Sequence, residues 1–388
     1  MIARRNIAKM AQKALSDPVY AWQAFHKRLR SALSYHLYDG RSAWPETISL
    51  FLTYKCNLTC YMCGQWGDAG AFKAFGDEVL RERLSKEEIC AFIDDVAFFR
   101  PNITLFGGEP MLYKGWTDIV AHIKRRRMRC NMVTNGTLMD VYANSIVEAG
   151  LDEIILSIDG PEEVHDRTRG AAGTFASILR GVRAVADAKA RRGARHPIIH
   201  VNCTITEENY QDLDGIVGVA EEMGVNGLNF HHLLFINQDM YDRHDAIFQA
   251  RFGQSTPDWK GFVWDHLPRI DPEILIAQIE KVAGRRSPVA VSVYPNFPPE
   301  EVRDYYTGFE FTSKGYKNRC MSLWMAAWVF PDGQVRPYHT MNFSPGNIRD
   351  QSFREIWNND RYLAYRREIK KRKRFPVCAK GCTELYRY

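Results

Sequence analysis

The 388-residue sequence lacks several features that would assign it to common classes of protein. It has no run of 18 or more apolar residues, so no transmembrane helix is predicted. The N-terminal stretch MIARRNIAKMAQKAL is basic but has no apolar core of the secretory kind, which argues against export and predicts a cytoplasmic location. The net charge is only +6, and no basic motif is interleaved with aromatic residues, so no nucleic acid is expected as a partner.

Cysteine is scarce, with nine residues in all, and three of them stand within eight positions in YKCNLTCYMCGQ, residues 54–65. A four-iron cluster normally takes one thiolate per iron, so Cys56, Cys60 and Cys63 would leave one iron open to a substrate or cofactor. A zinc site would need a fourth ligand, which this loop lacks. A redox pair of Cys60 and Cys63 would leave Cys56 without a role. The spacing therefore favours a cluster over these two alternatives.

Six short apolar runs between residues 47 and 235 alternate with longer segments of helical periodicity. The expected strands are TISLFLTY, NITLFGG, CNMVTNG, EIILSIDG, IIHVNCTIT and GLNFHHLLF. The clearest expected helix, SKEEICAFIDDVAFF, opens with a capping box from Ser85 to Glu88. This alternation predicts βα units and a parallel sheet, as an open sheet or a partial barrel. The polar motifs come directly after the strands, where βα barrels carry their chemistry.

Residues 1–45 are expected to form a basic, amphipathic helical extension. One face of this helix is apolar and is formed by Val19, Trp22, Phe25, Leu29 and Leu33. We expect the face to pack on the rest of the protein. The alternative is a helix that contacts a membrane surface or a partner.

Three further segments follow, with 46–240 as the core. Residues 241–315 are expected to be an irregular bridging region, because PNFPPEEV would break any long element. Residues 316–388 are expected to form a small α+β domain. In it, WMAAWVFPDGQVRPY predicts a hairpin that turns at Asp332 and Gly333, and SFREIWNNDRYLAYRREIKKRKR predicts one helix.

The cysteine loop resembles the signature of the radical S-adenosylmethionine (SAM) enzymes, because Cys56-x3-Cys60-x2-Cys63 directly follows the first strand of a βα series. The resemblance implies a fold of the α/β class, a partial (β/α)6 TIM-like barrel. A second match is GGEP, one βα unit later, which resembles the stretch that binds the methionine amino group of SAM. It is formed by Gly107, Gly108, Glu109 and Pro110. Glycines allow close backbone approach, and Glu109 offers a carboxylate to the ammonium.

Other positions are similar to the family's contacts with SAM. Met62 stands where many relatives carry an aromatic ring against adenine, and its thioether can pack there. The remaining candidates follow later strands and are Thr134, Asn135, Ser157, Asp159, Arg169 and Asn202, with Thr204 beside the last. Ordinary turn chemistry at strand ends is the alternative for each of them.

The C-terminal segment resembles the SPASM or twitch extension, which carries auxiliary iron–sulfur clusters. Its certain thiolates are Cys320, Cys378 and Cys382, because Tyr338 and His339 stand where the pattern usually has another cysteine. We expect a single auxiliary [4Fe–4S] cluster, with an open site or completed by Tyr338, His339 or a substrate. A degenerate, zinc-like remnant is the alternative.

Several other candidates are expected to be structural or stay undecided. Cys90, Cys130 and Cys203 are expected in the core, on a helix face and in two strands. His231 and His232 end the sixth strand, where a role in substrate contact and a structural role are equally open.

The resemblance implies an enzyme, either an oxidoreductase or a maturase of peptides and natural products. A one-electron donor such as flavodoxin or ferredoxin would reduce the cluster. SAM would then split into methionine and a 5′-deoxyadenosyl radical, which abstracts hydrogen from a peptide or small-molecule substrate. A carbohydrate or aminocyclitol dehydrogenase is the alternative within the family. The alternative from another class is an iron–sulfur electron carrier or scaffold that never cleaves SAM.

Overall fold

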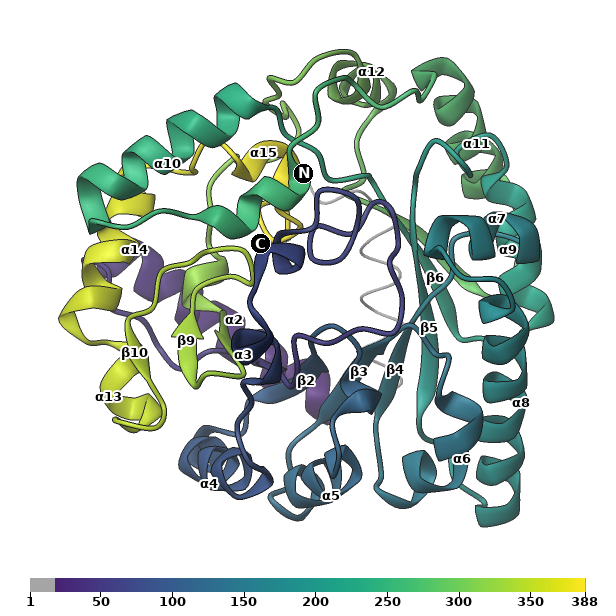
Figure 1. Ribbon diagram of the computed structural model, residues 1–388, viewed down its shortest axis with the longest axis horizontal. Coiled ribbons are helices and arrows are strands. Elements are labelled where there is room, and N and C mark those ends of the chain that lie inside the picture. Colours follow the sequence, from purple (N-terminus) through teal and green to yellow (C-terminus); the bar gives the residue numbers. More distant parts are fainter. Residues whose placement is uncertain (1–17, 388) are drawn as a thin grey trace.

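A single ten-stranded sheet organises the computed structural model, which describes residues 18–387. Strands β1 to β7 follow one another in sequence order, and each neighbouring pair is parallel. The strands are β1 (Thr47–Phe51), β2 (Asn102–Phe106), β3 (Cys130–Thr134), β4 (Glu153–Ser157), β5 (Ile198–Thr204), β6 (Gly227–His231), β7 (Ala290–Tyr294), β8 (Ala326–Val329), β9 (Gln334–Arg336) and β10 (Gly346–Asn347). The sheet is curved, as Figure 1 shows, and its edges are β7 and β10.

Most of the helices that connect strands β1 to β6 cover the outer, convex face of the sheet (Figure 1). The helices are α2 (Pro18–Leu37), α3 (Asp77–Arg81), α4 (Lys86–Val96), α5 (Trp116–Arg125), α6 (Met139–Glu148), α7 (Glu162–Arg169), α8 (Thr174–Arg192), α9 (Leu213–Glu222), α10 (Gln238–Phe252), α11 (Pro272–Gly284), α12 (Pro299–Thr307), α13 (Phe353–Trp357), α14 (Asp360–Arg372) and α15 (Cys378–Gly381). The capping box at Ser85 is present and begins α4. The α/β fold and the parallel core are thus as the sequence predicted.

Strands β2, β4 and β5 alternate in burial, and this alternation separates a core from an inner lumen. Along β5 the side chains of Ile199, Val201 and Cys203 are buried, whereas their neighbours in the strand are only partly covered. Side chains of a strand point alternately to its two faces, so the buried set packs on the helices and the other set lines the lumen. The lumen is therefore where polar strand residues are accessible.

The expectation of an irregular bridge over residues 241–315 is wrong. Two helices, α10 and α11, fill its first part, and β7 adds a seventh parallel strand beside β6. The prolines of PNFPPEEV do not interrupt an element there. Pro299 occupies the first turn of α12, where a missing N–H costs nothing.

The C-terminal segment continues the same sheet. Its hairpin turns at Asp332 and Gly333 as predicted, with a φ of 83° at Gly333 that favours glycine. Strand β8 pairs in parallel with β1, where Ala326 is opposite Thr47. The predicted single helix is two helices, because the Asn359 side chain accepts a hydrogen bond from the Tyr362 N–H and starts α14 anew.

The N-terminal segment is described from α2 onward, so residues 1–17 of the predicted extension lie outside the described residues, as does the side chain of Val19. Its other predicted face residues, Trp22, Phe25, Leu29 and Leu33, are exposed. The expectation that this face packs on the protein is therefore wrong. The helix instead packs through the side that carries Ser31 and Tyr35. No described helix is long and apolar enough to cross a membrane.

Candidate functional site

The cysteine loop leaves the carboxyl end of β1 and is held against several elements. Cys60 is buried, and Cys56 and Cys63 are half-buried. The Cys63 N–H donates to the Cys60 carbonyl at 2.9 Å and closes a turn between the two thiols. A tight approach to η4 (Pro257–Phe262) fixes the far side of the loop, since a Cβ on Gly261 would lie 1.9 Å from the Gly64 oxygen.

Two polar side chains, one directly after β3 and one at the end of α7, point at the sulfur atoms. The Asn135 amide nitrogen lies 3.9 Å from the Cys56 sulfur, and the Arg169 guanidinium lies 3.7 Å from the Cys60 sulfur. Asn135 also donates to the Asn57 side chain at 2.9 Å, which ties the end of β3 to the loop. N–H donors directed at sulfur stabilise thiolates and the sulfides of an anionic cluster.

Backbone contacts place GGEP beside the loop. The Gly108 N–H donates to the Thr53 carbonyl and the Glu109 N–H to the Lys55 carbonyl, both at 2.9 Å. A Cβ at Gly108 would lie 2.1 Å from the Lys55 oxygen, so this close approach requires glycine. Pro110 begins the short helix η3 (Pro110–Leu112). The second predicted motif thus lies directly against the segment that leads into the first.

The Glu109 carboxylate is fully buried and accepts three internal hydrogen bonds. Its oxygens accept from the Met111 N–H at 3.0 Å, the Thr134 hydroxyl at 2.9 Å and the Asn135 N–H at 2.9 Å. Burial raises the pKa of Glu109 to about 7, although the three hydrogen bonds stabilise the carboxylate and act in the opposite direction. The carboxylate therefore joins the ends of β2 and β3, while its predicted contact with the SAM ammonium stays a prediction.

Asp159 and Arg169 form a buried ion pair next to the loop. An Arg169 terminal nitrogen lies 2.6 Å from the Asp159 carboxylate, whose other oxygen accepts from the Thr204 N–H at 3.0 Å. Burial alone would lower the pKa of Arg169, but Asp159 and Cys60 raise it on balance. Asp159 thus holds a charged guanidinium over Cys60, and it does not itself face the lumen, since it is fully buried.

A row of neutral polar side chains crosses the lumen wall at one level. In the register of the sheet, Ser157 is opposite Asn202, Asn202 opposite Asn229, and Asn229 opposite Ser292. The two predicted residues, Ser157 and Asn202, are half-buried members of this row.

His231 lies above the row and is oriented by it. The Ser292 hydroxyl donates to the Asn229 amide oxygen at 3.0 Å, and the Asn229 amide nitrogen is 2.7 Å from His231 Nε2. This pattern makes Nε2 the acceptor and leaves the proton on Nδ1. Burial lowers the pKa of His231 to about 4, so the ring is neutral at pH 7.

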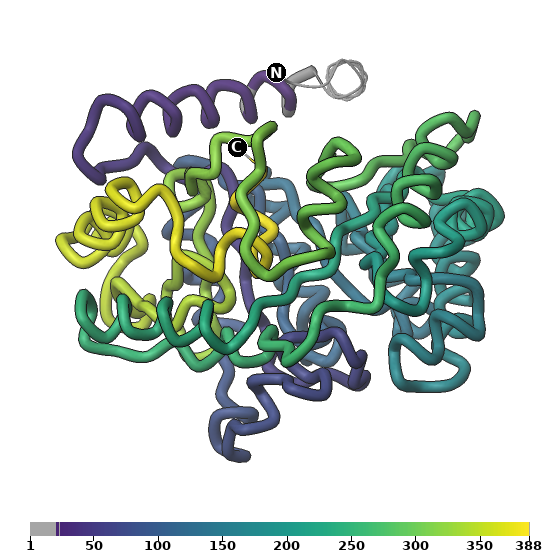
Figure 2. The backbone as a smooth tube through the Cα atoms, turned by 90° about the horizontal axis from the view of Figure 1, so that it is seen from above, coloured from purple at the N-terminus to yellow at the C-terminus, as the bar shows by residue number. Residues whose placement is uncertain are grey.

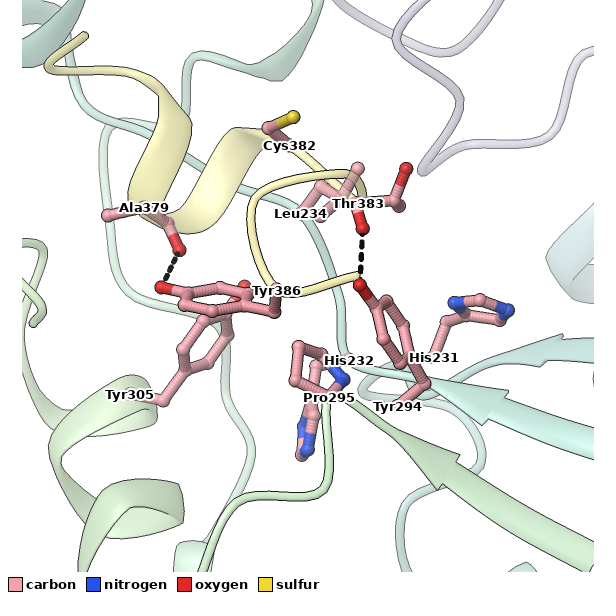
Figure 3. Close-up of a pocket in the computed structure, with 10 residues that line it drawn as sticks. All are labelled: His231, His232, Leu234, Tyr294, Pro295, Tyr305, Ala379, Cys382, Thr383 and Tyr386. Carbon is pink, nitrogen blue, oxygen red and sulfur yellow. Dashed lines mark hydrogen bonds between the residues drawn. The ribbon is translucent and has the colours of Figure 1, made fainter. Parts of the chain in front are cut away.

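His232 points away from His231 and contributes to packing (Figure 3). Its Nδ1 is 2.9 Å from the Tyr306 hydroxyl, and its ring packs against Phe297 and Tyr305. Figure 3 also shows the small pocket between these histidines and the C-terminal residues Cys382 and Thr383. Of the two candidates, only His231 stands at the lumen.

The three C-terminal cysteines come together from distant parts of the sequence. Cys378 begins α15 and Cys382 directly follows it, and the Cys320 N–H donates to the Lys373 carbonyl at 2.8 Å. Burial, followed by the proximity of Cys378 and Cys320, raises the pKa of Cys382 well above its ordinary value. The pKa of Cys320 is raised to about 11 and that of Cys378 to about 12, chiefly by burial.

Tyr338 and His339 differ in their relation to this group. The Tyr338 hydroxyl is 3.3 Å from both the N–H and the hydroxyl of Thr383, the residue after Cys382. His339 instead contacts the rings of Phe106 and Trp328, and burial lowers its pKa to about 3. Tyr338 is therefore the nearer of the two candidates to complete an auxiliary site.

The donor set fits iron–sulfur clusters better than single ions. In residues 18–387 no three His, Cys, Asp or Glu side chains are grouped closely enough to hold one metal ion. A four-iron cluster takes each thiolate on a different iron, so its sulfur ligands stand further apart. Each group offers three thiols, and the first adds N–H donors aimed at sulfur.

Sequence reasoning missed several residues that organise the site. The buried pair of Arg336 and Asp258, 3.1 Å apart, joins β9 of the hairpin to η4. Lys380 is buried between two of the cysteines, where its ammonium donates to the carbonyls of Tyr305 and Gly308. Such residues have no local signal, because their partners lie at least 70 positions away. The remaining cysteines behave as predicted in part, since Cys130 and Cys203 are buried and Cys90 is half-buried.

Comparisons with known proteins identify two domain families in this chain. The family model of the radical SAM superfamily matches residues 50–219, and that of the SPASM iron–sulfur cluster-binding domain matches residues 320–383.

Two curated relatives align over most of the chain. The Fe-coproporphyrin III synthase of Methanosarcina barkeri is 29% identical over 322 residues, which are 79% of this chain and 72% of the relative. The pre-heme d1 synthase of Dinoroseobacter shibae is 25% identical over 353 residues, 85% of this chain and 77% of the relative.

Among solved structures, Streptococcus suis SuiB bound to its precursor peptide SuiA has the same fold. The TM-score is 0.60 at 10% identity, over 90% of this chain and 72% of that one. The chain therefore contains a radical SAM domain and a SPASM domain: it is an enzyme, and its cofactors are a [4Fe–4S] cluster, SAM and auxiliary iron–sulfur clusters.

Proposed function

We propose that this enzyme cleaves SAM reductively and abstracts hydrogen from a peptide or small-molecule substrate bound in the lumen. When bound, the cluster and SAM supply a 5′-deoxyadenosyl radical as the hydrogen-abstracting species. The observation that carries the proposal is the convergence of the cysteine loop, GGEP and the polar lumen wall at the carboxyl edge of one parallel sheet.

The loop residues would hold the cluster and balance its charge. Cys56, Cys60 and Cys63 supply three thiolates, and Arg169 supplies a positive charge 3.7 Å from Cys60. Because Asp159 fixes Arg169 at 2.6 Å, the guanidinium needs little reorganisation when an anionic group binds. Burial raises the pKa of Cys56 to about 12, so that thiol becomes a thiolate only with a bound cation.

The ends of β2 and β3 would receive the amino acid part of SAM. Glu109 holds Thr134 and Asn135 in place through hydrogen bonds of 2.9 Å. The close glycine backbone at Gly107 and Gly108 leaves no side chain between this rim and the loop. We infer that the ammonium group meets this rim and that Glu109 provides the negative charge behind it.

The wall of β4 to β7 would hold the substrate by neutral hydrogen bonds. Its row consists of Ser157, Asn202, Asn229 and Ser292, with neutral His231 above it. Hydroxyl and amide groups match hydroxyls or peptide groups of a substrate better than they match carboxylates. This row therefore favours a peptide or a hydroxyl-bearing small molecule as the substrate. The second class includes the sugars and aminocyclitols that a dehydrogenase of this family would oxidise.

The C-terminal cysteines would hold a single auxiliary cluster beside the lumen. Cys382 lies at the pocket that His231 and Tyr294 also line. A cluster there would accept an electron from a substrate radical or anchor the substrate. Tyr338 is the candidate to complete it.

A second candidate is the modification of a tetrapyrrole, which the names of the two curated relatives favour. A propionate-bearing tetrapyrrole would need cationic partners, whereas the row in β4 to β7 is neutral. We therefore rank this reading second.

The test is the reaction of the reconstituted, anaerobically reduced enzyme with SAM alone. We expect 5′-deoxyadenosine and methionine as products, and none from the Cys60→Ala variant. An iron–sulfur electron carrier would give neither product and would overturn the proposal. Adding a peptide, a sugar mixture or iron coproporphyrin then tells the substrate classes apart. The true substrate should increase the yield of 5′-deoxyadenosine and, when it is deuterated, should transfer deuterium to that product.

A further inference from the structure

The N-terminal helix α2 exposes its most apolar face. The exposed fractions are 63% for Trp22, 57% for Phe25, 43% for Leu29, 47% for Leu33 and 69% for Leu37. Residues three or four apart lie on one side of a helix, so these five form a continuous apolar ridge. Of the eleven large hydrophobic side chains that the described residues expose, six lie between positions 22 and 38. The exposed hydrophobic side chains are thus clustered on α2, whereas single exposed hydrophobic residues are usually scattered over a protein surface.

The opposite side of α2 fixes the ridge in its outward orientation. Arg28 makes two hydrogen bonds to the Glu46 carboxylate, at 2.7 and 3.0 Å. The Tyr35 ring packs edge-on against Trp324 with ring centroids 4.7 Å apart, and the Ala43 N–H donates to the Ser34 hydroxyl at 3.1 Å. Because these contacts occupy the inner face, the helix cannot turn to bury the ridge without breaking them.

Positive charge also accompanies the ridge. The described residues 18–41 contain four Lys and Arg and one Asp, a net charge of +3, which is half of that of the whole chain. Beside α2 lies a shallow hollow lined by Lys27, Arg100, Arg127 and Arg129 together with Glu46. Glu46 is the single carboxylate among them and is paired with Arg28, and Arg129 is paired with Glu153 at 2.9 Å.

The ridge lies on the side of the barrel opposite to the cysteine loop. Lys27 donates to the carbonyl of Arg100, which comes just before β2, and Glu46 comes just before β1, so α2 crosses the amino ends of these strands. The cysteine loop leaves the carboxyl end of β1. Figure 2 shows α2 along one margin of the molecule.

We propose that α2 and the basic hollow bind the enzyme peripherally to an anionic membrane surface. A preformed helix with Trp, Phe and Leu on its outer face and Lys and Arg along its sides matches a helix that lies in the bilayer interface. Anionic headgroups complement both the rim and the hollow. A second copy of this chain fits less well, because a two-fold contact would bring two equally basic rims together. Binding in this way leaves the mouth of the lumen facing water, so the substrate enters from the aqueous side.

Vesicle co-sedimentation of the full, cluster-loaded chain tests the proposal. We expect binding to vesicles of phosphatidylcholine with 30% phosphatidylglycerol and at least tenfold weaker binding to phosphatidylcholine alone. Trp22→Ser with Phe25→Ser should lower binding at least tenfold. The matched control is Val141→Ser, which removes a 73% exposed apolar side chain on α6 and should leave binding unchanged.

A second pair of variants tests the role of charge by position. Arg100→Gln with Arg127→Gln should lower binding to the anionic vesicles about tenfold. Lys114→Gln with Arg183→Gln removes the same charge from other faces and should have little effect. Iron content and circular dichroism confirm that each variant is folded.

Three outcomes would overturn the proposal. One is absence of wild-type binding to anionic vesicles. Another is equal loss in the ridge variant and its control. The third is a wild-type dimer in light scattering that Trp22→Ser with Phe25→Ser converts to a monomer, which would assign the ridge to a subunit interface.

Discussion

The two groups of cysteines in this chain contain three thiols each, yet they are built in opposite ways. Cys56, Cys60 and Cys63 come from one loop beside the lumen, where Cys56 and Cys63 are partly accessible and Cys60 is buried. In the second group, Cys320 precedes Cys378 by 58 positions, and the tertiary fold brings it to Cys378 and Cys382. The first group can therefore open to a ligand from solution, whereas the second depends on the packing of the C-terminal segment.

Their electrostatic surroundings differ as well. Side chains of Asn135 and Arg169 approach the first group, and Arg169 brings a positive charge. Near the second group the Glu384 N–H donates to the Cys382 sulfur at 3.3 Å, while the Glu384 carboxylate adds negative charge and, after burial, helps to raise the pKa of Cys382 and Cys320. The side chain of Arg169 thus brings a positive charge to the first group, whereas that of Glu384 brings a negative charge to the second.

The largest effect is expected from the first group. Cys60→Ala should remove about four irons per chain and abolish SAM cleavage, because two thiolates cannot hold a cluster with an open iron. Iron analysis and 5′-deoxyadenosine yield are the measurements. Cys90→Ala is the control, since Cys90 lies on α4 and is predicted to be no ligand. Unchanged iron in Cys60→Ala would contradict the assignment.

The second group should matter in a different way. Changing Cys378 and Cys382 together to Ala should lower iron from about eight to about four per chain, one four-iron cluster per site. SAM cleavage without substrate should largely survive, and substrate turnover should fail. If the native protein holds only about four irons, all of them lost with Cys60, the C-terminal cysteines are a remnant or a zinc site.

The comparison also explains what could be predicted from the sequence. Three features could be predicted because each has a local signal in the sequence. The loop cysteines have their spacing, GGEP has its pair of glycines, and each strand has an apolar run of about five residues. Strand β7 was missed because its alternation, AVSVY, is short and follows no turn motif that distinguishes it from a bridge. The exposed ridge of α2 was assigned to the interior, since an amphipathic pattern alone does not say which face meets the protein.

The network around Glu109 lay beyond prediction for a related reason. Its partners are Met111, Thr134 and Asn135, and the last two belong to another strand. A sequence motif identifies the carboxylate, but it does not show how many hydrogen bonds the carboxylate oxygens already accept within the folded protein. The same holds for Arg169, whose contact with Cys60 spans 109 positions.

Glu109→Gln should change both SAM binding and the pH dependence of stability. Gln keeps one oxygen for Met111 and Thr134 but turns an amide N–H₂ towards the Asn135 N–H, and it removes the negative charge. SAM affinity measured by equilibrium dialysis should fall by about 2–5 kcal/mol, the cost of losing one partner of a desolvated charge pair. Iron content should stay unchanged. Unaltered affinity would leave GGEP with a purely structural role.

The sign of the pH effect follows from burial. The pKa of Glu109 is raised to about 7 from an ordinary 4.5, so the folded protein favours the protonated acid. The stability that this group contributes is full below pH 4.5 and is lost as the pH rises through 7, by about 3 kcal/mol. Urea unfolding of the cluster-free protein at pH 4.5 and 8 should show this loss in the wild type and not in Glu109→Gln. An equal slope in both would assign the pH dependence elsewhere.

The smallest expected effect sharpens the electrostatic contrast between the two cysteine groups. Glu384 is buried, its N–H contacts the Cys382 sulfur, and its carboxylate is held by Arg387 at 2.9 Å and Ser322 at 3.4 Å. Glu384→Gln keeps the backbone donor and removes one negative charge beside the auxiliary site. Because a nearby negative charge disfavours the reduced, more anionic cluster, the potential of the auxiliary cluster should rise by about 60 mV, or about 1–2 kcal/mol. The potential of the cluster at Cys56, Cys60 and Cys63 should not change. After burial, the carboxylates that raise the pKa of Cys56 and Cys60 are Glu109 and Asp159, and not Glu384. A redox titration followed by electron paramagnetic resonance separates the two signals, with the exposed Glu87→Gln as control. A shift in both potentials, or in neither, would mean that Glu384 does not set the difference between the groups.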